Sequence, residues 1–202
     1  MTAKNIQFTK IEIRIAKYLF KHYKDRYNPR QLAAILSINH AHANKLCKAL
    51  SDKQILVKEE IGNSIYYSYN YSDNYAIKFI EYLLSLEKEE FSCCLSVLLH
   101  SLERFVPYIK LGLVFGSSIK NKDFNDIDVL LVYDNKIANK IEKIKEEIRK
   151  SELIEKPIRY MDILEKDILS NKEDKVFYGI MSDNLIFHNP EKYVEMIKRC
   201  HR

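Results

Sequence analysis

Two aspartates stand where they could bind a metal ion. Asp126 and Asp128 are separated by one residue and lead directly into the apolar run 129–132. Because residues i and i+2 of a strand face the same side, we expect both carboxylates to project together from the start of a buried strand. Two such carboxylates repel each other unless a cation lies between them, and oxygen ligands of this kind suit Mg²⁺.

A Gly-Ser pair shortly before the aspartates could bind phosphate. The apolar run 109–115 predicts a strand, and Gly116 and Ser117 follow it directly. A turn of this kind offers backbone N–H groups and a hydroxyl to an anion. A phosphate-binding turn combined with paired metal-binding carboxylates is the equipment of phosphoryl or nucleotidyl transfer.

The order of strand, Gly116-Ser117, spacer, Asp126-x-Asp128 and strand resembles the nucleotidyltransferase superfamily of DNA polymerase beta, and most of all its small, minimal branch. The resemblance covers about half of the chain, residues 107–202. It implies that the aspartates hold one or two Mg²⁺ (or Mn²⁺) ions and that the turn holds a nucleoside triphosphate, with ATP expected. Lys120 or Lys122 would neutralise the phosphates, and members of this family often have an arginine near the position of Lys120.

The resemblance also implies a third carboxylate on the next strand, which Pro157 opens and which we expect over residues 158–164. Asp162 is the candidate for a third catalytic and metal-binding residue. A shift of three residues in the alignment would put Arg159 in that place instead. A real third carboxylate favours catalysis, whereas an arginine there favours a nucleotide sensor.

The first third of the chain resembles a winged helix-turn-helix over residues 8–72. Helical spacing over residues 9–27, an Asn28-Pro29 start before a short second helix and a third helix after Asn39 precede a hairpin at Gly62-Asn63. The resemblance implies that the third helix enters a DNA major groove and that the hairpin touches the backbone. The expected contacts are His42, Lys45, Lys48 and, in the wing with its tyrosine neighbours, Tyr67. An interaction or dimerisation module is the alternative, because Glu59 and Glu60 beside the wing would repel phosphate.

Two apolar helical stretches in residues 73–106 form a connector. Their apolar faces are wider than one packed surface requires, so they predict either a homodimer interface or packing within the chain. Cys93 and Cys94 lie in this pattern and are expected to be buried thiols. After the third strand, one helix over residues 165–182, a short strand and a last helix from Pro190 are expected.

Composition limits the classes of protein that remain. In 202 residues, 47% are hydrophobic and 30% charged, and no stretch approaches the length of a membrane span. The N-terminus has no apolar signal-peptide core, so a cytoplasmic location without membrane contact is expected. A net charge of +5 permits nucleic-acid binding without requiring it.

The sequence therefore predicts a two-domain α/β (α+β) protein. It would consist of a winged helix-turn-helix (1–72), a helical connector (73–106) and a small mixed-sheet nucleotidyltransferase fold (107–202). The first hypothesis for function is a Mg²⁺-dependent enzyme that transfers a nucleoside monophosphate to a protein or RNA acceptor, targeted or autoregulated through DNA binding. The second is a DNA-binding transcription regulator whose transferase-like half binds a nucleotide without turnover. A dimeric interaction module is the third.

Overall fold

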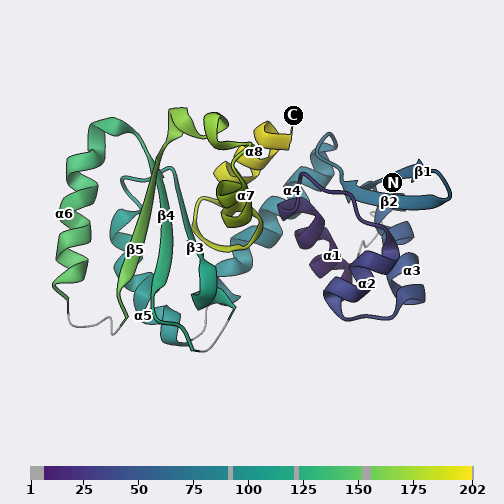
Figure 1. Cartoon of the computed structure of the whole chain (residues 1–202), viewed down its shortest axis with the longest axis horizontal. Helices are drawn as coiled ribbons and strands as arrows, with labels where there is room; N and C mark the ends of the chain where they lie inside the picture. Colours follow the sequence, from purple (N-terminus) through teal and green to yellow (C-terminus); the bar gives the residue numbers. More distant parts are fainter. Residues whose placement is uncertain (1–6, 91–92, 121–122, 152–155, 202) are drawn as a thin grey trace. The chain divides into compact units, whose positions relative to one another are not determined.

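The structure, a computed structural model, describes residues 7–90, 93–120, 123–151 and 156–201, with backbone alone for residues 90 and 93–96. The chain divides into two compact units, an N-terminal one that ends at Leu83 and a C-terminal one that begins at Leu84. The fold is mixed α/β, as predicted: the N-terminal unit contains a two-stranded hairpin and the C-terminal unit a four-stranded sheet (Figure 1).

Side-chain caps set the starts of the first helices. They are α1 (Lys10–Lys21), α2 (Pro29–Leu36) and α3 (His40–Asp52). Thr9 and Glu12 form a reciprocal capping box at α1, and Asn28 and Gln31 form another at α2. Such a cap stabilises a helix by about 1 kcal/mol because it satisfies N–H groups that have no partner within the helix. The Asn28-Pro29 start was therefore predicted correctly, whereas α1 ends six residues before its predicted end.

An antiparallel hairpin follows the three helices, formed by β1 (Leu56–Ile61) and β2 (Ser64–Tyr69). Gly62 turns the chain with a φ of 58°, which confirms the predicted turn. Alternation along β2 buries Tyr67 and Tyr69, so the tyrosine-rich strand supplies core to this unit.

The residues that the sequence assigned to a connector are divided between the two units. Helix α4 (Asn74–Ser85) begins beside Asp73, whose carboxylate accepts a hydrogen bond from the Ala76 N–H, and it lies almost wholly in the N-terminal unit. The short helix η1 (Leu86–Glu90), helix α5 (Cys93–Leu102) and η2 (Glu103–Phe105) belong to the C-terminal unit. The side chains of Cys93 and Cys94 lie outside the described residues.

The sheet of the C-terminal unit has the strand order β5-β4-β3-β6. Its strands are β3 (Leu111–Phe115), β4 (Ile127–Tyr133), β5 (Ile158–Leu164) and β6 (Asn184–His188). β3 is antiparallel to β4 and β6, and β4 is parallel to β5. The end of β3 and the starts of β4, β5 and β6 therefore meet at one end of the sheet.

One face of the sheet packs on α5 and on α6 (Ala138–Arg149), which contributes Ile141, Ile144 and Ile148 to a shared core. Odd-numbered β4 residues, Ile127 to Tyr133, face this helix. Helices α7 (Lys175–Ser182) and α8 (Pro190–His201) lie on the side of the strands away from α6 (Figure 1).

The single helix predicted over residues 165–182 is wrong in its first half. Two short 3-10 turns, Glu165–Asp167 and Leu169–Asn171, precede α7. The Asp174 carboxylate accepts hydrogen bonds from the N–H groups of Val176 and Phe177 and so starts α7 at Lys175. Apolar spacing alone did not reveal this cap.

Candidate functional site

The predicted Gly-Ser turn lies at the end of the sheet where β3 ends. It forms a short 3-10 helix, η3 (Gly116–Ile119), which Gly116 enters with a φ of 80°. The Ser117 side chain is exposed, whereas the buried Ser118 hydroxyl donates a hydrogen bond to the Phe115 carbonyl at 3.2 Å. Ser118 thus anchors the turn, and Ser117 remains accessible to a ligand.

Glycine is required at position 116 for two reasons. A φ of 80° is unfavourable for any residue with a Cβ. A Cβ added at this position would also overlap the Asp128 carboxylate. The pairing of Phe115 with Asp128 across β3 and β4 produces this close approach. The sheet therefore brings the predicted phosphate turn and the predicted metal carboxylate together.

Asp126 and Asp128 lie side by side as the spacing predicted. Asp126 directly precedes β4, and Asp128 is its second residue. Burial raises the pKa of Asp128, the negative charge of Asp126 raises it further, and the nearby Arg159 acts in the opposite direction. A carboxylate with a raised pKa gains most when a cation arrives, so the electrostatics of this pair favour a bound positive charge.

A positive charge from the protein already lies beside the pair. Arg159 of β5 pairs in register with Asp128 of the parallel strand β4. Its guanidinium donates to the Asp126 carboxylate, with an Nη2–Oδ2 distance of 2.7 Å. The arginine side chain is 71% exposed and the Asp126 side chain 16% exposed, so the ion pair joins an exposed cation to a largely buried carboxylate.

Asp162, the predicted third carboxylate, does not join this pair. It pairs in register with Leu131, three residues further along than Arg159, which corresponds to about 10 Å along a strand. The shift is odd, so Asp162 projects from the opposite face of the sheet, where its carboxylate contacts the Lys145 ammonium of α6. Within the described ranges, the structure contains no cluster of three or more His, Cys, Asp or Glu residues able to hold a metal ion.

Lys120 lies at the end of the turn, where the sequence placed a phosphate-binding cation. Its Nζ atom is 2.6 Å from the Asp183 carboxylate, and both side chains are about half exposed. Exposed ion pairs are weak, so an incoming phosphate could draw this ammonium away from Asp183. Asp183 precedes β6 and was not singled out in the sequence, because it has no motif of its own. Lys122 lies outside the described residues.

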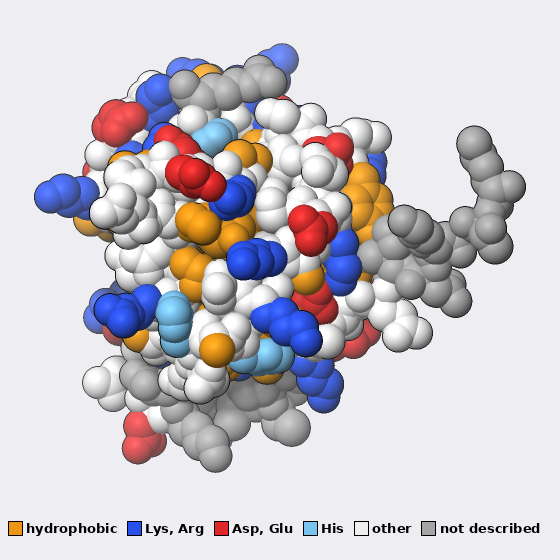
Figure 2. Space-filling model, turned by 90° about the vertical axis from the view of Figure 1, so that its right-hand side faces the viewer, with side chains coloured by type: hydrophobic (Ala, Val, Ile, Leu, Met, Phe, Trp, Pro, Cys, Tyr) orange, Lys and Arg blue, Asp and Glu red, His pale blue; other side chains and the backbone are white. Residues whose placement is uncertain are grey.

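The expected DNA contacts are distributed unequally in the N-terminal unit. His42, Lys45 and Lys48 are all exposed on α3, at spacings of three residues that place them along one side of the helix. The view in Figure 2 shows Lys, Arg and His side chains among hydrophobic side chains and scattered carboxylates. The helix therefore offers a basic surface of modest charge.

The prediction for Tyr67 is wrong, because its side chain is fully buried and cannot reach a DNA backbone. The strand alternates, so Tyr67 faces the core while Tyr66 and Ser68 lie toward solvent. Glu59 and Glu60, the wing acids expected to repel DNA, each form an ion pair within the N-terminal unit. Glu59 binds Arg26 at 2.7 Å, and Glu60 binds Lys58 at 2.6 Å.

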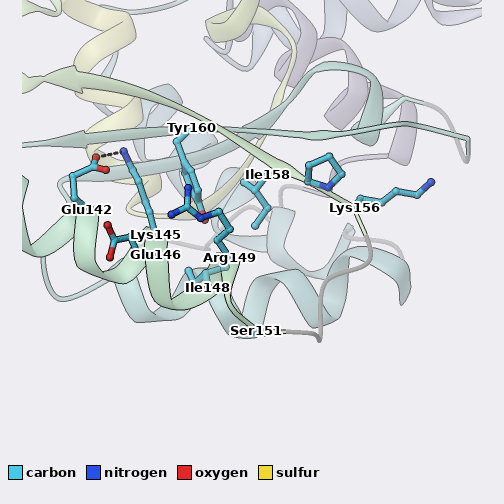
Figure 3. Close-up of a pocket in the computed structure, with 10 residues that line it drawn as sticks. Glu142, Lys145, Glu146, Ile148, Arg149, Ser151, Lys156, Ile158 and Tyr160 are labelled. Atoms are coloured by element: carbon cyan, nitrogen blue, oxygen red, sulfur yellow. Dashed lines mark hydrogen bonds and ion pairs between the residues drawn. The ribbon is translucent and has the colours of Figure 1, made fainter.

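Sequence reasoning also missed a cavity of about 700 Å³ between α6 and the start of β5 (Figure 3). Lys145 and Arg149 of α6 and Tyr160 of β5 point into it, and Lys145 also binds Glu142 at 2.8 Å. The Tyr160 hydroxyl is buried without a hydrogen-bond partner among the described residues, and burial raises its pKa. This cavity lies on the α6 face, so the sheet separates it from Asp126 and Asp128.

Comparisons with known proteins assign no role to these residues. No protein-family model, curated protein or solved structure matches the chain. In the part of the chain that the structure describes, no helix has the length and apolar character of a membrane span.

Proposed function

We propose that the chain is a DNA-binding regulator. Its N-terminal unit would be a winged helix-turn-helix, and its C-terminal unit a nucleotidyltransferase-like domain that binds a nucleoside triphosphate without transferring it. The observation that carries the proposal is the place of Arg159, which lies in register beside Asp128 and binds Asp126. A transferring enzyme of this type would have a third carboxylate there.

Nucleotide binding is supported by the Gly-Ser turn and the aspartate pair. The amides of Gly116 and Ser117, together with the exposed Ser117 hydroxyl, would hold the outer phosphates. Asp126 and Asp128 would hold a Mg²⁺ ion, and the glycine that lets the turn meet Asp128 fits this arrangement. When bound, Mg²⁺ would screen the charge of the triphosphate. Lys120 would leave Asp183 for the phosphates.

DNA binding is supported by the exposed side chains of α3. Lys45 and Lys48 would neutralise phosphates, and His42 would lie near base edges if α3 enters a major groove. Glu59 and Glu60 each form an ion pair with a basic side chain of the same unit. These ion pairs reduce the repulsion that the two acids would exert on DNA. Nucleotide binding in one unit would then be the signal, and DNA binding in the other the response.

A second candidate, Mg²⁺-dependent transfer of a nucleoside monophosphate to a protein or RNA, is favoured by one observation. The turn approaches Asp128 closely and Asp126 lies beside Asp128, as such chemistry requires. The acceptor hydroxyl would attack the α-phosphorus and pyrophosphate would leave. This candidate would require catalysis with two carboxylates.

The test is calorimetric titration of ATP, and then of the other triphosphates, with Mg²⁺ into the full chain. We expect binding that is lost in Asp128→Asn and kept in the control Asp134→Asn, whose carboxylate lies after the opposite end of β4. Labelled triphosphate incubated with cell extract and the full chain should then label no protein or RNA beyond what the extract labels without the chain. Labelling that depends on Asp128 would establish the transferase instead, and the absence of binding by every triphosphate would overturn both candidates.

A further inference from the structure

We propose that this site accepts one divalent cation, together with the triphosphate, and that the Arg159 guanidinium takes the place of a second. The proposal rests on the nucleotide binding proposed above and specifies the ligand of the same site. A two-ion site places its metals about 3.5–4 Å apart, so that carboxylates must bridge them and complete both ligand sets. The described residues supply two carboxylates and one guanidinium at this place.

The charge of the site matches one ion. Asp126 and Asp128 carry two negative charges when ionised. Arg159, at a distance of 2.7 Å from Asp126, compensates one of them with its positive charge. A guanidinium stays charged at every accessible pH, so it cannot give way by losing a proton. One net negative charge attracts a divalent cation only weakly unless the phosphates of the nucleotide join as further ligands.

The geometry prevents Asp162 from supplying the missing ligand. It projects from the α6 face of the sheet and is held there by Lys145, whose side chain is only 12% exposed. A rotamer change cannot carry its carboxylate through a paired strand to the face of Asp128. Among the described residues of β5, Arg159 is therefore the side chain that can reach the aspartate pair by lying directly across from it.

The orientation of Arg159 also suits a phosphate. Its side chain is 71% exposed, so the guanidinium can turn toward an incoming ligand, and a bound cation would then take its place at the Asp126 carboxylate, which is only 16% exposed. A planar guanidinium binds phosphate oxygens with two parallel hydrogen bonds. Arg159 would thus neutralise the triphosphate. It would do so from the place of the second ion, which in an enzyme would activate the acceptor hydroxyl. This explains binding without transfer.

The experiment counts Mn²⁺ ions bound by the full chain, using the electron paramagnetic resonance signal of free Mn²⁺ in equilibrium dialysis. We expect wild type to bind one Mn²⁺ per chain with a saturating, non-hydrolysable ATP analogue and to bind Mn²⁺ weakly without it. Arg159→Asp should bind two ions with the analogue, and its affinity for Mn²⁺ without nucleotide should rise by at least about tenfold, because one positive charge becomes a negative ligand.

Arg149→Asp is the matched control. It makes the same charge change in the same unit, on the α6 face of the sheet, and should leave the ion count at one. If Arg159→Asp does not fold, as judged by its melting curve, Arg159→Asn supplies a neutral oxygen ligand at the same place and should give a smaller gain in Mn²⁺ affinity.

Two Mn²⁺ ions in wild type, or equal behaviour of Arg159→Asp and Arg149→Asp, would overturn the proposal. The measurement without nucleotide distinguishes failure of the proposed nucleotide binding from failure of the assignment of Arg159 to an ion position. If no protein binds the analogue but Arg159→Asp gains Mn²⁺ affinity over wild type, the nucleotide function is wrong and the assignment of Arg159 to the ion position stands. If that gain is also missing, both are wrong.

Discussion

Gly116, directly after β3, lies so close to the Asp128 carboxylate of β4 that there is no room for a Cβ beside it. The turn that would hold phosphate and the carboxylate that would hold a cation are therefore a single structural feature. A change in one must displace the other, and this coupling makes the site testable with small substitutions.

Gly116→Ala should destabilise the C-terminal unit and lower nucleotide affinity. A positive φ costs an alanine about 1 kcal/mol, and the new methyl group must displace Asp128. Gly62→Ala is the control, because Gly62 has a φ of 58° but no atom within 4 Å of an added Cβ. Urea unfolding should show a cost for both variants, and calorimetry should show lost nucleotide affinity for Gly116→Ala alone. Unchanged affinity in Gly116→Ala would contradict the coupling.

Asp183→Asn should strengthen nucleotide binding about two- to fivefold, because it releases Lys120 from an exposed ion pair. Asp134→Asn breaks a comparable exposed pair, with Lys110 at 3.4 Å, beyond the far end of β4 and should leave affinity unchanged. Titration of ATP with Mg²⁺ into both variants makes the comparison. A weaker affinity in Asp183→Asn would mean that Asp183 itself serves the ligand.

The stability of the N-terminal unit should depend on pH through Glu12. Burial acts to raise the pKa of this carboxyl, but hydrogen bonds from Lys53 and Thr9 together outweigh it and lower the pKa below its ordinary value of 4.5. A lowered folded-state pKa contributes stability above pH 4.5, and this contribution is lost as the pH falls through the folded value.

Glu12→Gln should therefore flatten the stability profile below pH 4.5 and cost about 1 kcal/mol at pH 7, because glutamine keeps the cap but loses the charge opposite Lys53. Urea unfolding of both proteins from pH 3.5 to 7 measures the difference. Glu81→Gln, which removes the ion pair between Glu81 and the exposed Lys78, controls for general acid effects. Parallel profiles of wild type and Glu12→Gln would refute this assignment.

Lys45→Ala and Lys48→Ala should each weaken DNA binding at all sequences and reduce the slope of log K against log salt by about 0.9. Both side chains are exposed on α3. Lys166→Ala removes an exposed lysine of the C-terminal unit and should leave the slope unchanged. Fluorescence anisotropy with duplex DNA at several salt concentrations provides the measurement. Equal slopes in all four proteins would favour the interaction-module alternative for the N-terminal unit.

Local signals in the sequence were enough to predict much of the fold. The Asn28-Pro29 cap, the Gly62 turn and the Asp126-x-Asp128 pair each depend on chemistry within a few residues, and each was found as predicted. The fold could be read at this level because caps and tight turns have their own residue requirements.

The register of β5 could not be predicted in the same way. Arg159 and Asp162 lie in one strand, three residues apart, and either could have been aligned with Asp128. An odd shift moves every side chain to the other face, so the choice between the two residues is a choice between faces. Long-range pairing with β4 decides it, and no local signal in residues 158–164 records that pairing. The prediction that Tyr67 contacts DNA was wrong for the same reason. Alternation along the strand allows either face to point inward, and long-range packing places Tyr67 on the buried face.

The buried Glu87 has a consequence for how the molecule behaves in a crowded solution. Its carboxylate accepts the Ile186 N–H at 3.1 Å, on the side of β6 that faces away from β3. A strand edge with unpaired N–H groups invites another chain to add to the sheet and begin aggregation. By occupying such a group, η1 caps the sheet at β6 and works against the uncontrolled growth of a β-assembly. Replacing this side chain would therefore leave the Ile186 N–H at an unprotected strand edge and favour aggregation.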